Sequence, residues 1–167
     1  MICPAWLFSF LIVALASPGN GVASVADSEA VTSADRASPL PQEVRDGLDI
    51  EVVPGDRKIR IKDLAAPGKI TILDYFAEWC GPCHLLSPKL ERLLVAYDNL
   101  ALRKVELENY ESEAAVQAMY KFGMPGLPYT MIVDDRGKVL GQVFGDHIEE
   151  IEAVVRKHAR PHAEVAP

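Results

Sequence analysis

Two cysteines stand two residues apart and are followed by a histidine in the heptapeptide Glu78-Trp79-Cys80-Gly81-Pro82-Cys83-His84. Two different chemistries use this spacing. A C-x-x-C pair is the arrangement of a redox-active dithiol, whereas C-x-x-C-H is the arrangement that attaches a c-type haem. The heptapeptide alone therefore leaves two hypotheses, a thiol–disulfide enzyme and an electron-carrying cytochrome, and the rest of the chain distinguishes them.

The length, net charge and cysteine content of the chain restrict the class of protein. Its 167 residues are enough for one domain with a sizeable core but not comfortably for two. The formal net charge of −7 argues against a nucleic-acid partner, because nucleic-acid binders carry a basic stripe. The cysteines are Cys3, Cys80 and Cys83, too few for a scaffold stapled by disulfides. The close pair therefore indicates chemistry rather than scaffolding.

The first 24 residues contain no Asp, Glu, Lys or Arg. Their apolar run over residues 5–16 has the length of a signal-peptide core and is short for a spanning helix. Small residues at Ala14–Ala16 and Gly21–Ala23 offer cleavage sites, although no Lys or Arg precedes the run. We predict a signal peptide over residues 1–23 and a periplasmic or otherwise extracytoplasmic protein, soluble after cleavage. The alternatives are an uncleaved anchor formed by residues 5–16 and a buried segment.

The remaining chain divides by composition. Residues 24–47 are rich in Ala, Ser, Pro and acids without any periodicity, which predicts a flexible linker. A folded domain is expected over 48–160 and a loose tail over 161–167. Alternating residues at 49–53 and 58–62, on either side of a Pro-Gly-Asp turn, allow an extra β-hairpin at the N-terminal end of this domain.

The domain alternates strand and helix patterns. The apolar run at residues 70–77 is typical of a strand buried on both faces, and leucines at three- and four-residue steps predict a helix after Cys83. The further expected elements are a strand at 101–107, a helix at 111–122, strands at 129–133 and 138–144 joined by a tight turn, and a helix at 148–159. This order indicates an α/β protein with a central mixed sheet covered by helices.

Several separated features resemble the thioredoxin superfamily across residues 58–159. An acid precedes the first cysteine by six residues, a proline follows the second by five, a lysine lies on the next strand, and a Gly-Leu-Pro loop precedes the third strand. With the active-site segment, these are Asp74, Phe76–Cys83, Pro88, Lys104 and Gly126–Pro128. The resemblance implies the thioredoxin fold and a cis peptide bond before Pro128.

Two departures bear on the subfamily. Phe76 stands where many thioredoxins have Trp, and Tyr129 stands where they usually have Thr. The order Leu-Pro-x-Thr, followed by apolar residues and Asp134, is closer to exported TlpA/ResA-like proteins, which supply electrons to apocytochromes and other extracytoplasmic disulfides. The connection after the active-site helix is short, as in thioredoxin itself.

The resemblance implies roles for the site residues. Cys80, at the start of a helix, is the exposed nucleophile, since helix N-termini favour a thiolate. Cys83 is buried and resolves the mixed disulfide. A buried acid is costly unless protonated or paired, so Asp74 is interpreted as the base for Cys83, with Lys104 nearby, although a purely structural Asp74 is the alternative. The expected substrate-binding residues are Trp79, Gly81, Pro82, Leu127 and Pro128.

The haem hypothesis needs His84 and a distal ligand. Candidate ligands exist in Met119, Met124, Met131 and His147, but a haem protein has no use for Asp74, and a zinc site lacks a second ligand cluster. We therefore predict an exported thiol–disulfide oxidoreductase that reduces protein clients, with no cofactor beyond its redox disulfide and no metal. A monomer supplied by a membrane electron donor is expected. A disulfide oxidase or isomerase and a non-catalytic binding module are the alternatives.

Overall fold

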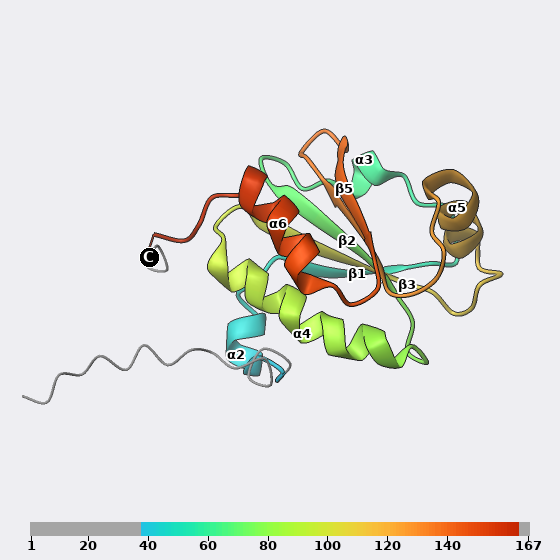
Figure 1. Cartoon of the computed structure of the whole chain (residues 1–167), viewed down its shortest axis with the longest axis horizontal. Helices are drawn as coiled ribbons and strands as arrows, with labels where there is room; N and C mark the ends of the chain where they lie inside the picture. The colour runs from blue at the N-terminus through green and yellow to red at the C-terminus, as the bar shows by residue number, and fades with distance from the viewer. Residues whose placement is uncertain (1–37, 164–167) are drawn as a thin grey trace, which may run out of the picture. The chain divides into compact units, whose positions relative to one another are not determined.

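The computed structural model describes residues 38–163. The predicted signal peptide, the linker up to residue 37 and the last four residues of the tail lie outside this part of the chain. The elements in chain order are α2 (Gln42–Arg45), β1 (Ile50–Pro54), α3 (Ile61–Leu64), β2 (Ile70–Phe76), α4 (Gly81–Ala96), β3 (Leu100–Glu106), α5 (Glu113–Phe122), β4 (Tyr129–Val133), β5 (Val139–Phe144) and α6 (Ile148–His158) (Figure 1).

The five strands form one mixed sheet in the order β1-β3-β2-β4-β5. β1, β3 and β2 run parallel, whereas β4 is antiparallel to both β2 and β5. All seven residues of β2 are buried, because the strand has neighbours on both sides and packed side chains on both faces. The predicted turn between β4 and β5 is present, with Asp134 Oδ1 accepting the backbone N–H groups of Arg136 at 3.0 Å and Lys138 at 2.8 Å.

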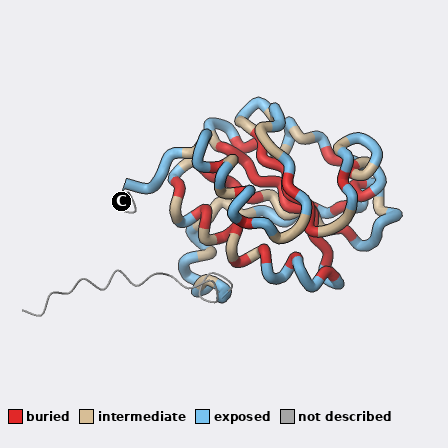
Figure 2. The backbone as a smooth tube through the Cα atoms, viewed as in Figure 1, coloured by how far each residue is buried: buried red, intermediate tan, exposed pale blue. Residues whose placement is uncertain are grey.

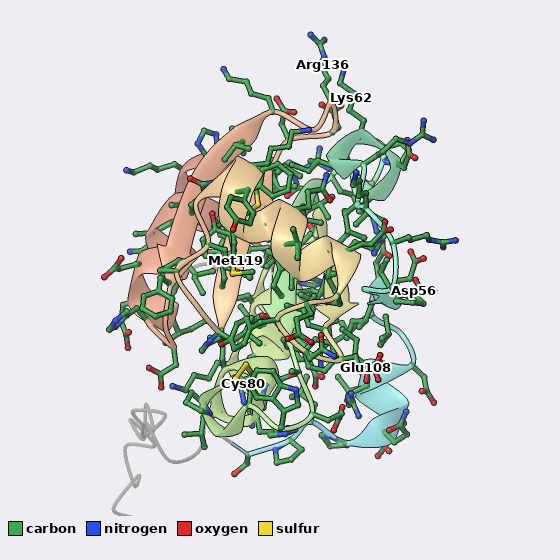
Figure 3. The ribbon with its side chains drawn as sticks, turned by 90° about the vertical axis from the view of Figure 1, so that its right-hand side faces the viewer. Asp56, Lys62, Cys80, Glu108, Met119 and Arg136 are labelled. Atoms are coloured by element: carbon green, nitrogen blue, oxygen red, sulfur yellow. A yellow bond between two sulfur atoms is a disulfide. The ribbon has the colours of Figure 1, made fainter. Side chains whose placement is uncertain are left out.

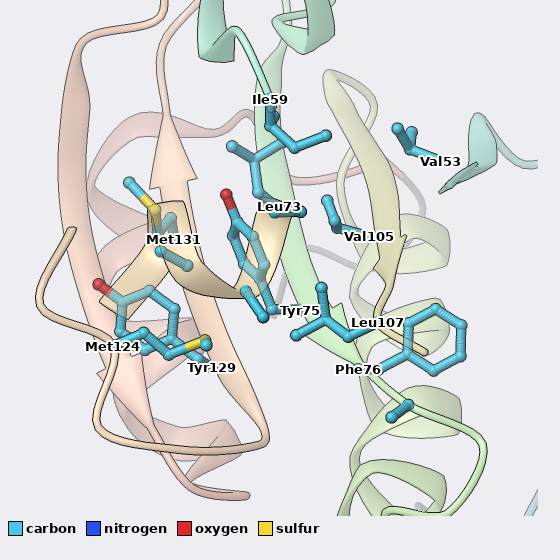
Figure 4. Packing of buried hydrophobic residues seen from close by; sticks show 14 of the residues in the cluster. Val53, Ile59, Leu73, Tyr75, Phe76, Val105, Leu107, Met124, Tyr129 and Met131 are labelled. Atoms are coloured by element: carbon cyan, nitrogen blue, oxygen red, sulfur yellow. The ribbon is translucent and has the colours of Figure 1, made fainter. Parts of the chain in front are cut away.

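Helices cover both faces of the sheet. On one face Ile72, Leu102 and Ile132 pack with buried residues of α4 and α6, such as Leu90 and Ile151. On the opposite face the core is built around Leu73, Tyr75, Val105 and Met131, together with the alanines of α5. Figure 4 shows the Tyr75 ring between Met131 and Val105, and Figure 2 shows the buried residues concentrated in the central strands.

The extra N-terminal hairpin is a wrong prediction. β1 pairs in parallel with β3, so that Val52 lies opposite Lys104, and α3 follows where the second hairpin strand was expected. Ile59 is buried, and its backbone N–H and C=O groups form hydrogen bonds with a side chain instead of with a neighbouring strand. Its N–H donates to Gln117 Oε1 at 2.6 Å, and its carbonyl accepts from Gln117 Nε2 at 3.0 Å.

Ordered structure also extends beyond the predicted domain bounds. The end of the predicted linker forms α2, and Arg45 of this helix pairs with Glu91 of α4 at 2.9 Å. At the other end Pro161 forms a β-bridge with Tyr97, so the predicted tail begins attached to the domain. Glu91 is 3% exposed, and a carboxylate buried to that extent needs a counter-charge. The charge of Arg45 therefore accounts for the packing of α2 against α4.

No helix within residues 38–163 has the length and apolar character needed to cross a membrane.

Candidate active site

The two cysteines lie at the junction between the central strand, β2, and α4, the longest of the described helices. Cys80 is the N-cap of α4, and its Sγ accepts the backbone N–H of Cys83 at 3.3 Å. Pro82, in the first turn of the helix, has no N–H that would need a partner. The sulfurs form a Cys80–Cys83 disulfide with a Cα–Cα distance of 5.3 Å, visible beside the Cys80 label in Figure 3.

The exposure of the cysteines differs from the prediction. Cys80 is 5% exposed and Cys83 is 2% exposed, so the expected contrast between an exposed and a buried sulfur is small in the disulfide form. The neighbouring Gly81 and Pro82 are exposed, and nothing lies within 4 Å of a Cβ placed on Gly81. Gly81 and Pro82 therefore form an exposed surface next to the disulfide.

Trp79 is fixed beside the disulfide although its side chain is 54% exposed. Its indole Nε1 donates to the carbonyl of Glu108 at 2.8 Å, and its ring meets Tyr110 edge-on with centroids 5.3 Å apart. The ring borders a groove of about 390 Å³, whose other lining residues include Asp56, Glu78, Glu106 and Glu108. Trp79 is thus held as an exposed wall of the site, which suits the predicted contact with clients.

The Gly-Leu-Pro loop brings its residues to the same part of the core. The peptide bond between Leu127 and Pro128 is cis, as the resemblance implies. Pro128 is buried, and its carbonyl accepts the N–H of Gly145 at 2.9 Å. Leu127 is half-buried and packs against the cluster that contains both cysteines. The structure therefore joins this loop to the disulfide through one apolar cluster.

Asp74 lies in the middle of β2 and is 1% exposed. Its register partners are Lys104 on β3 and Thr130 on β4. Neither carboxyl oxygen has a hydrogen-bond partner among the described residues. Burial raises the pKa of Asp74 from 3.8 to about 7, while the positive charge of Lys104 acts in the opposite direction. The carboxyl is thus able to gain or lose a proton near neutral pH.

Lys104 is near Asp74 but is occupied elsewhere. Its Nζ donates to Ser87 Oγ of α4 at 2.8 Å and lies 4.3 Å from the centroid of the Phe76 ring. Phe76, the departure from the usual Trp, therefore supplies an aromatic face for the ammonium. Lys104 influences Asp74 through space rather than through a direct hydrogen bond.

Sequence reasoning missed two polar residues at this site. Ser87 accepts a hydrogen bond from Lys104, and Thr130 lies opposite Asp74 in the β2–β4 ladder. Strand alternation could have placed Thr130 on the same face as the core residue Ile132, two residues further on, but not opposite Asp74. The departure at Tyr129 is also explained, because its hydroxyl donates to the carbonyl of Phe122 at the end of α5 at 2.8 Å. Burial raises the pKa of that phenol.

Three of the residues considered as haem ligands have other contacts or positions in the structure. His84 Nε2 lies 2.8 Å from the carbonyl of Glu78, and Met124 and Met131 are buried core residues. Among residues 38–163 no group of three His, Cys, Asp or Glu side chains is arranged to hold a metal ion.

Comparison with known proteins assigns the family. The thioredoxin family model matches residues 60–157. The chain belongs to the thioredoxin family. Thioredoxin H8 of Arabidopsis thaliana is 27% identical over 103 residues, which are 62% of this chain and 66% of that protein. Thioredoxin Asp f 28 of Aspergillus fumigatus is 26% identical over 106 residues, 64% of this chain and 93% of that protein.

Solved structures agree with this assignment. The short form of thioredoxin f from spinach chloroplast is 27% identical, with a TM-score of 0.53, and the match covers 65% of this chain and 92% of that one. A thioredoxin f2 in complex with ferredoxin:thioredoxin reductase gives 25% identity, a TM-score of 0.53 and coverage of 65% and 94%. The predicted thioredoxin fold, a mixed sheet flanked by helices, is confirmed. The predicted enzyme class, thiol–disulfide oxidoreductase, is confirmed at the level of the family.

Proposed function

We propose that this thioredoxin-family protein reduces disulfide bonds of client proteins by cycling Cys80 and Cys83 between dithiol and disulfide. The observation that carries the proposal is the position of the disulfide. The disulfide lies at the N-terminus of α4 and shares one apolar cluster with Leu127 of the cis-proline loop. The strand that precedes it, β2, carries the buried Asp74.

In the first step the Cys80 thiolate attacks one sulfur of a client disulfide. A Cys80–client disulfide forms, the client S–S bond breaks, and the departing client sulfur leaves with the electron pair and takes up a proton. The Cys83 N–H, which already donates to Cys80 Sγ, and the positive end of the α4 dipole favour the attacking thiolate.

In the second step Cys83 releases the client. Asp74 accepts the proton of the Cys83 thiol, and the Cys83 thiolate attacks Cys80 Sγ. The Cys80–Cys83 bond forms, the bond to the client breaks, and the second client sulfur leaves with the electron pair and is protonated. Two electrons have moved from the protein to the client. A carboxyl with a pKa of about 7 suits this role, because a base acts best when its pKa is near the working pH.

The finer assignment is an exported reductant of the TlpA/ResA-like type, with cytochrome c maturation as one use. The uncharged apolar run at residues 5–16 and the order Leu127-Pro128-Tyr129-Thr130 support it. A reductant in an oxidising compartment needs a supply of electrons, so a membrane donor is part of the proposal, and the protein works as a monomer. Mass spectrometry of the mature protein should find an N-terminus after Ala16 or Ala23, and an intact Met1 in the soluble fraction would overturn export.

Insulin reduction with a small-thiol donor tests the activity. The wild-type protein should accelerate insulin precipitation, and the Cys80→Ser variant should not. A wild-type rate no higher than that of the small thiol alone would favour the non-catalytic binding module.

The reduction potential tests the direction of electron flow. The Gly81-Pro82 dipeptide is that of thioredoxins, so titration in a glutathione buffer should give a value near the thioredoxin potential of about −270 mV. A value above about −180 mV, in the range of isomerases and oxidants, would reassign the protein as an oxidase or isomerase.

A further inference from the structure

Three side chains of adjacent strands form a row under α4. Asp74 of β2 lies between Lys104 of β3 and Thr130 of β4, its partners in the two ladders. Register partners point to the same face of a sheet, and Ile72 and Ile132, two residues away along their strands, pack in the cluster with α4 and α6. Thr130 is therefore directed to the face on which Asp74 lies.

The hydrogen bonds in this row are incomplete. Lys104 donates to Ser87, whereas both carboxyl oxygens of Asp74 and the hydroxyl oxygen of Thr130 have no partner among the described residues. Thr130 is 0% exposed and Asp74 is 1% exposed. Buried polar side-chain atoms in native proteins nearly always have a partner, and Thr130 and Asp74 stand directly opposite each other in the β2–β4 ladder.

The spacing of the strands allows the contact. Directly opposite residues of an antiparallel pair have Cβ atoms about 4.5–5.5 Å apart, so rotation about the χ1 angles of Thr130 and Asp74 brings a hydroxyl within hydrogen-bond distance of a carboxyl. A hydroxyl both donates and accepts. It accepts from a protonated acid and donates to a carboxylate, and the bond to the carboxylate is the stronger of the two.

We propose that Thr130 is a positioning residue for Asp74, whose hydroxyl accepts from the protonated acid and donates to the ionised carboxylate. The contact itself is a property of the folded protein. Its use in catalysis rests on the proposed function, because the hydroxyl then stabilises the base form that takes the proton of Cys83. In this arrangement Lys104 and Thr130 support the Asp74 carboxylate from opposite sides, one by charge and the other by a hydrogen bond.

Other charged groups around Asp74 are engaged elsewhere. On α4, Glu91 pairs with Arg45 and Lys89 lies 3.9 Å from Asp146. The buried positions of α6 are apolar, and β5 contains no charged residue. Among the described residues, Lys104 is therefore the charged group that shifts the pKa of Asp74. In the reduced protein the Cys83 thiol is a further titratable neighbour.

The test is the titration of Asp74 in the oxidised protein, followed by carboxyl ¹³C NMR. Thr130→Val keeps the shape of the side chain and removes the hydroxyl, so it should raise the pKa of Asp74 by about one unit, the scale of a hydrogen bond to a charged group. Thr130→Ser retains the hydroxyl and should titrate like the wild type. At pH 7 the ionised fraction in Thr130→Val would fall about fivefold, and the resolving step should slow by the same factor.

A matched control comes from the same sheet. Thr71 is also fully buried, but its Oγ1 accepts the N–H of Ala66 at 2.9 Å, so Thr71→Val should leave the Asp74 titration unchanged. If Thr130→Val does not fold, Thr130→Ala removes the same hydroxyl and should shift the titration in the same direction. An unchanged titration in the folded hydroxyl-free variant, or an equal shift in Thr130→Ser, overturns the proposal.

The NMR readout needs no turnover, so the two proposals fail separately. A shifted Asp74 titration in a protein that does not reduce insulin supports the hydrogen bond and overturns the reductase. An unshifted titration in an active protein overturns the role of Thr130 alone.

Discussion

Lys104 and Asp74 are direct neighbours in the β3–β2 ladder, yet the ammonium of Lys104 donates to Ser87 Oγ at 2.8 Å and not to the Asp74 carboxyl. Asp74 therefore receives the field of the positive charge without a salt bridge. Burial raises its pKa more than the lysine lowers it, and the result is about 7. An ion pair at this position would instead have kept the carboxyl ionised and a poor proton acceptor at neutral pH.

Removing the charge of Lys104 should raise the pKa of Asp74 further. Lys104→Gln retains a donor for Ser87 and removes the field that favours the carboxylate, so the midpoint of the Asp74 titration should move above about 7. Carboxyl ¹³C NMR measures it. Lys89→Gln is the control, because Lys89 is a lysine of α4 whose ammonium lies 3.9 Å from Asp146. A midpoint that stays or falls in Lys104→Gln contradicts the electrostatic role of Lys104.

The buried acid should also make stability depend on pH. The pKa of Asp74 is higher in the folded protein than its ordinary value of 3.8, so the folded state binds more protons between pH 4 and 7. The contribution of protonated Asp74 to the free energy of unfolding is fully present below about pH 4, and it is lost as the pH rises through 7. A displacement of about three pKa units corresponds to a penalty on the order of 4 kcal/mol above pH 7.

Asp74→Asn isolates that penalty. The variant has no titrating group at this position, so the difference in the free energy of unfolding, variant minus wild type, should grow by roughly 3 kcal/mol between pH 4.5 and 8. Urea unfolding at several pH values measures this difference, because the contributions of all other titrating groups are the same in both proteins and cancel. A difference that is constant across this range would mean that Asp74 is ionised throughout.

The site was largely predictable because its residues stand at fixed intervals in one short segment. Asp74, Cys80, Cys83 and Pro88 lie within 15 residues, and the buried strand and the helix leave clear periodic patterns. β4 was predicted with the bounds that the structure has, Tyr129–Val133, since a run of apolar residues before a tight turn is a strong local pattern.

The pairing of β1 was not predictable by the same means. The alternation at residues 49–53 is compatible with any strand partner, and the nearest alternating segment suggested a hairpin. The actual partner is β3, with Ile50 opposite Leu102, a contact between residues 52 positions apart. Thr130 was missed for a related reason, because its position opposite Asp74 depends on the register of β2 and β4, which the sequence pattern does not specify.

The contact between α2 and α4 should be measurable as stability. Arg45→Ala removes the partner of Glu91, whose side chain is 4% exposed, while that of Arg45 is 38% exposed. Because the arginine side of the pair is partly solvated, we expect a loss of about 1–3 kcal/mol, less than for a fully buried pair. Arg60→Ala breaks the exposed Arg60–Asp63 pair and should cost under about 1 kcal/mol. Chemical denaturation of both variants compares them, and equal losses would mean that α2 is not held by Glu91.

Tyr129 should stabilise the link between α5 and β4. Tyr129→Phe removes the hydrogen bond to the carbonyl of Phe122 and retains the ring packed near Tyr75. The expected loss is about 1 kcal/mol in the free energy of unfolding. Tyr120→Phe is the control, since Tyr120 is 87% exposed, and it should be neutral. A neutral Tyr129→Phe would contradict a structural role for the hydroxyl.

The two cysteines should differ in reactivity even though their exposed fractions are both small. In the reduced protein Cys80 retains the N-cap position of α4 and the N–H of Cys83 as a donor, and both favour its thiolate. Cys83 lies inside the first turn and is 2% exposed. Brief alkylation at pH 7, followed by peptide mass spectrometry, should therefore label Cys80 faster than Cys83.

The same asymmetry predicts which variant traps clients. Cys83→Ser retains the nucleophile and removes the resolving thiol, so mixed disulfides with client proteins should accumulate on Cys80. Cys80→Ser lacks the nucleophile and is the matched control, which should trap few. Non-reducing gels of both variants after exposure to disulfide-containing protein give the comparison. Equal labelling of the two thiols together with equal trapping by the two variants would show that the N-cap position does not activate Cys80, and the order of the two proposed steps would have to be abandoned.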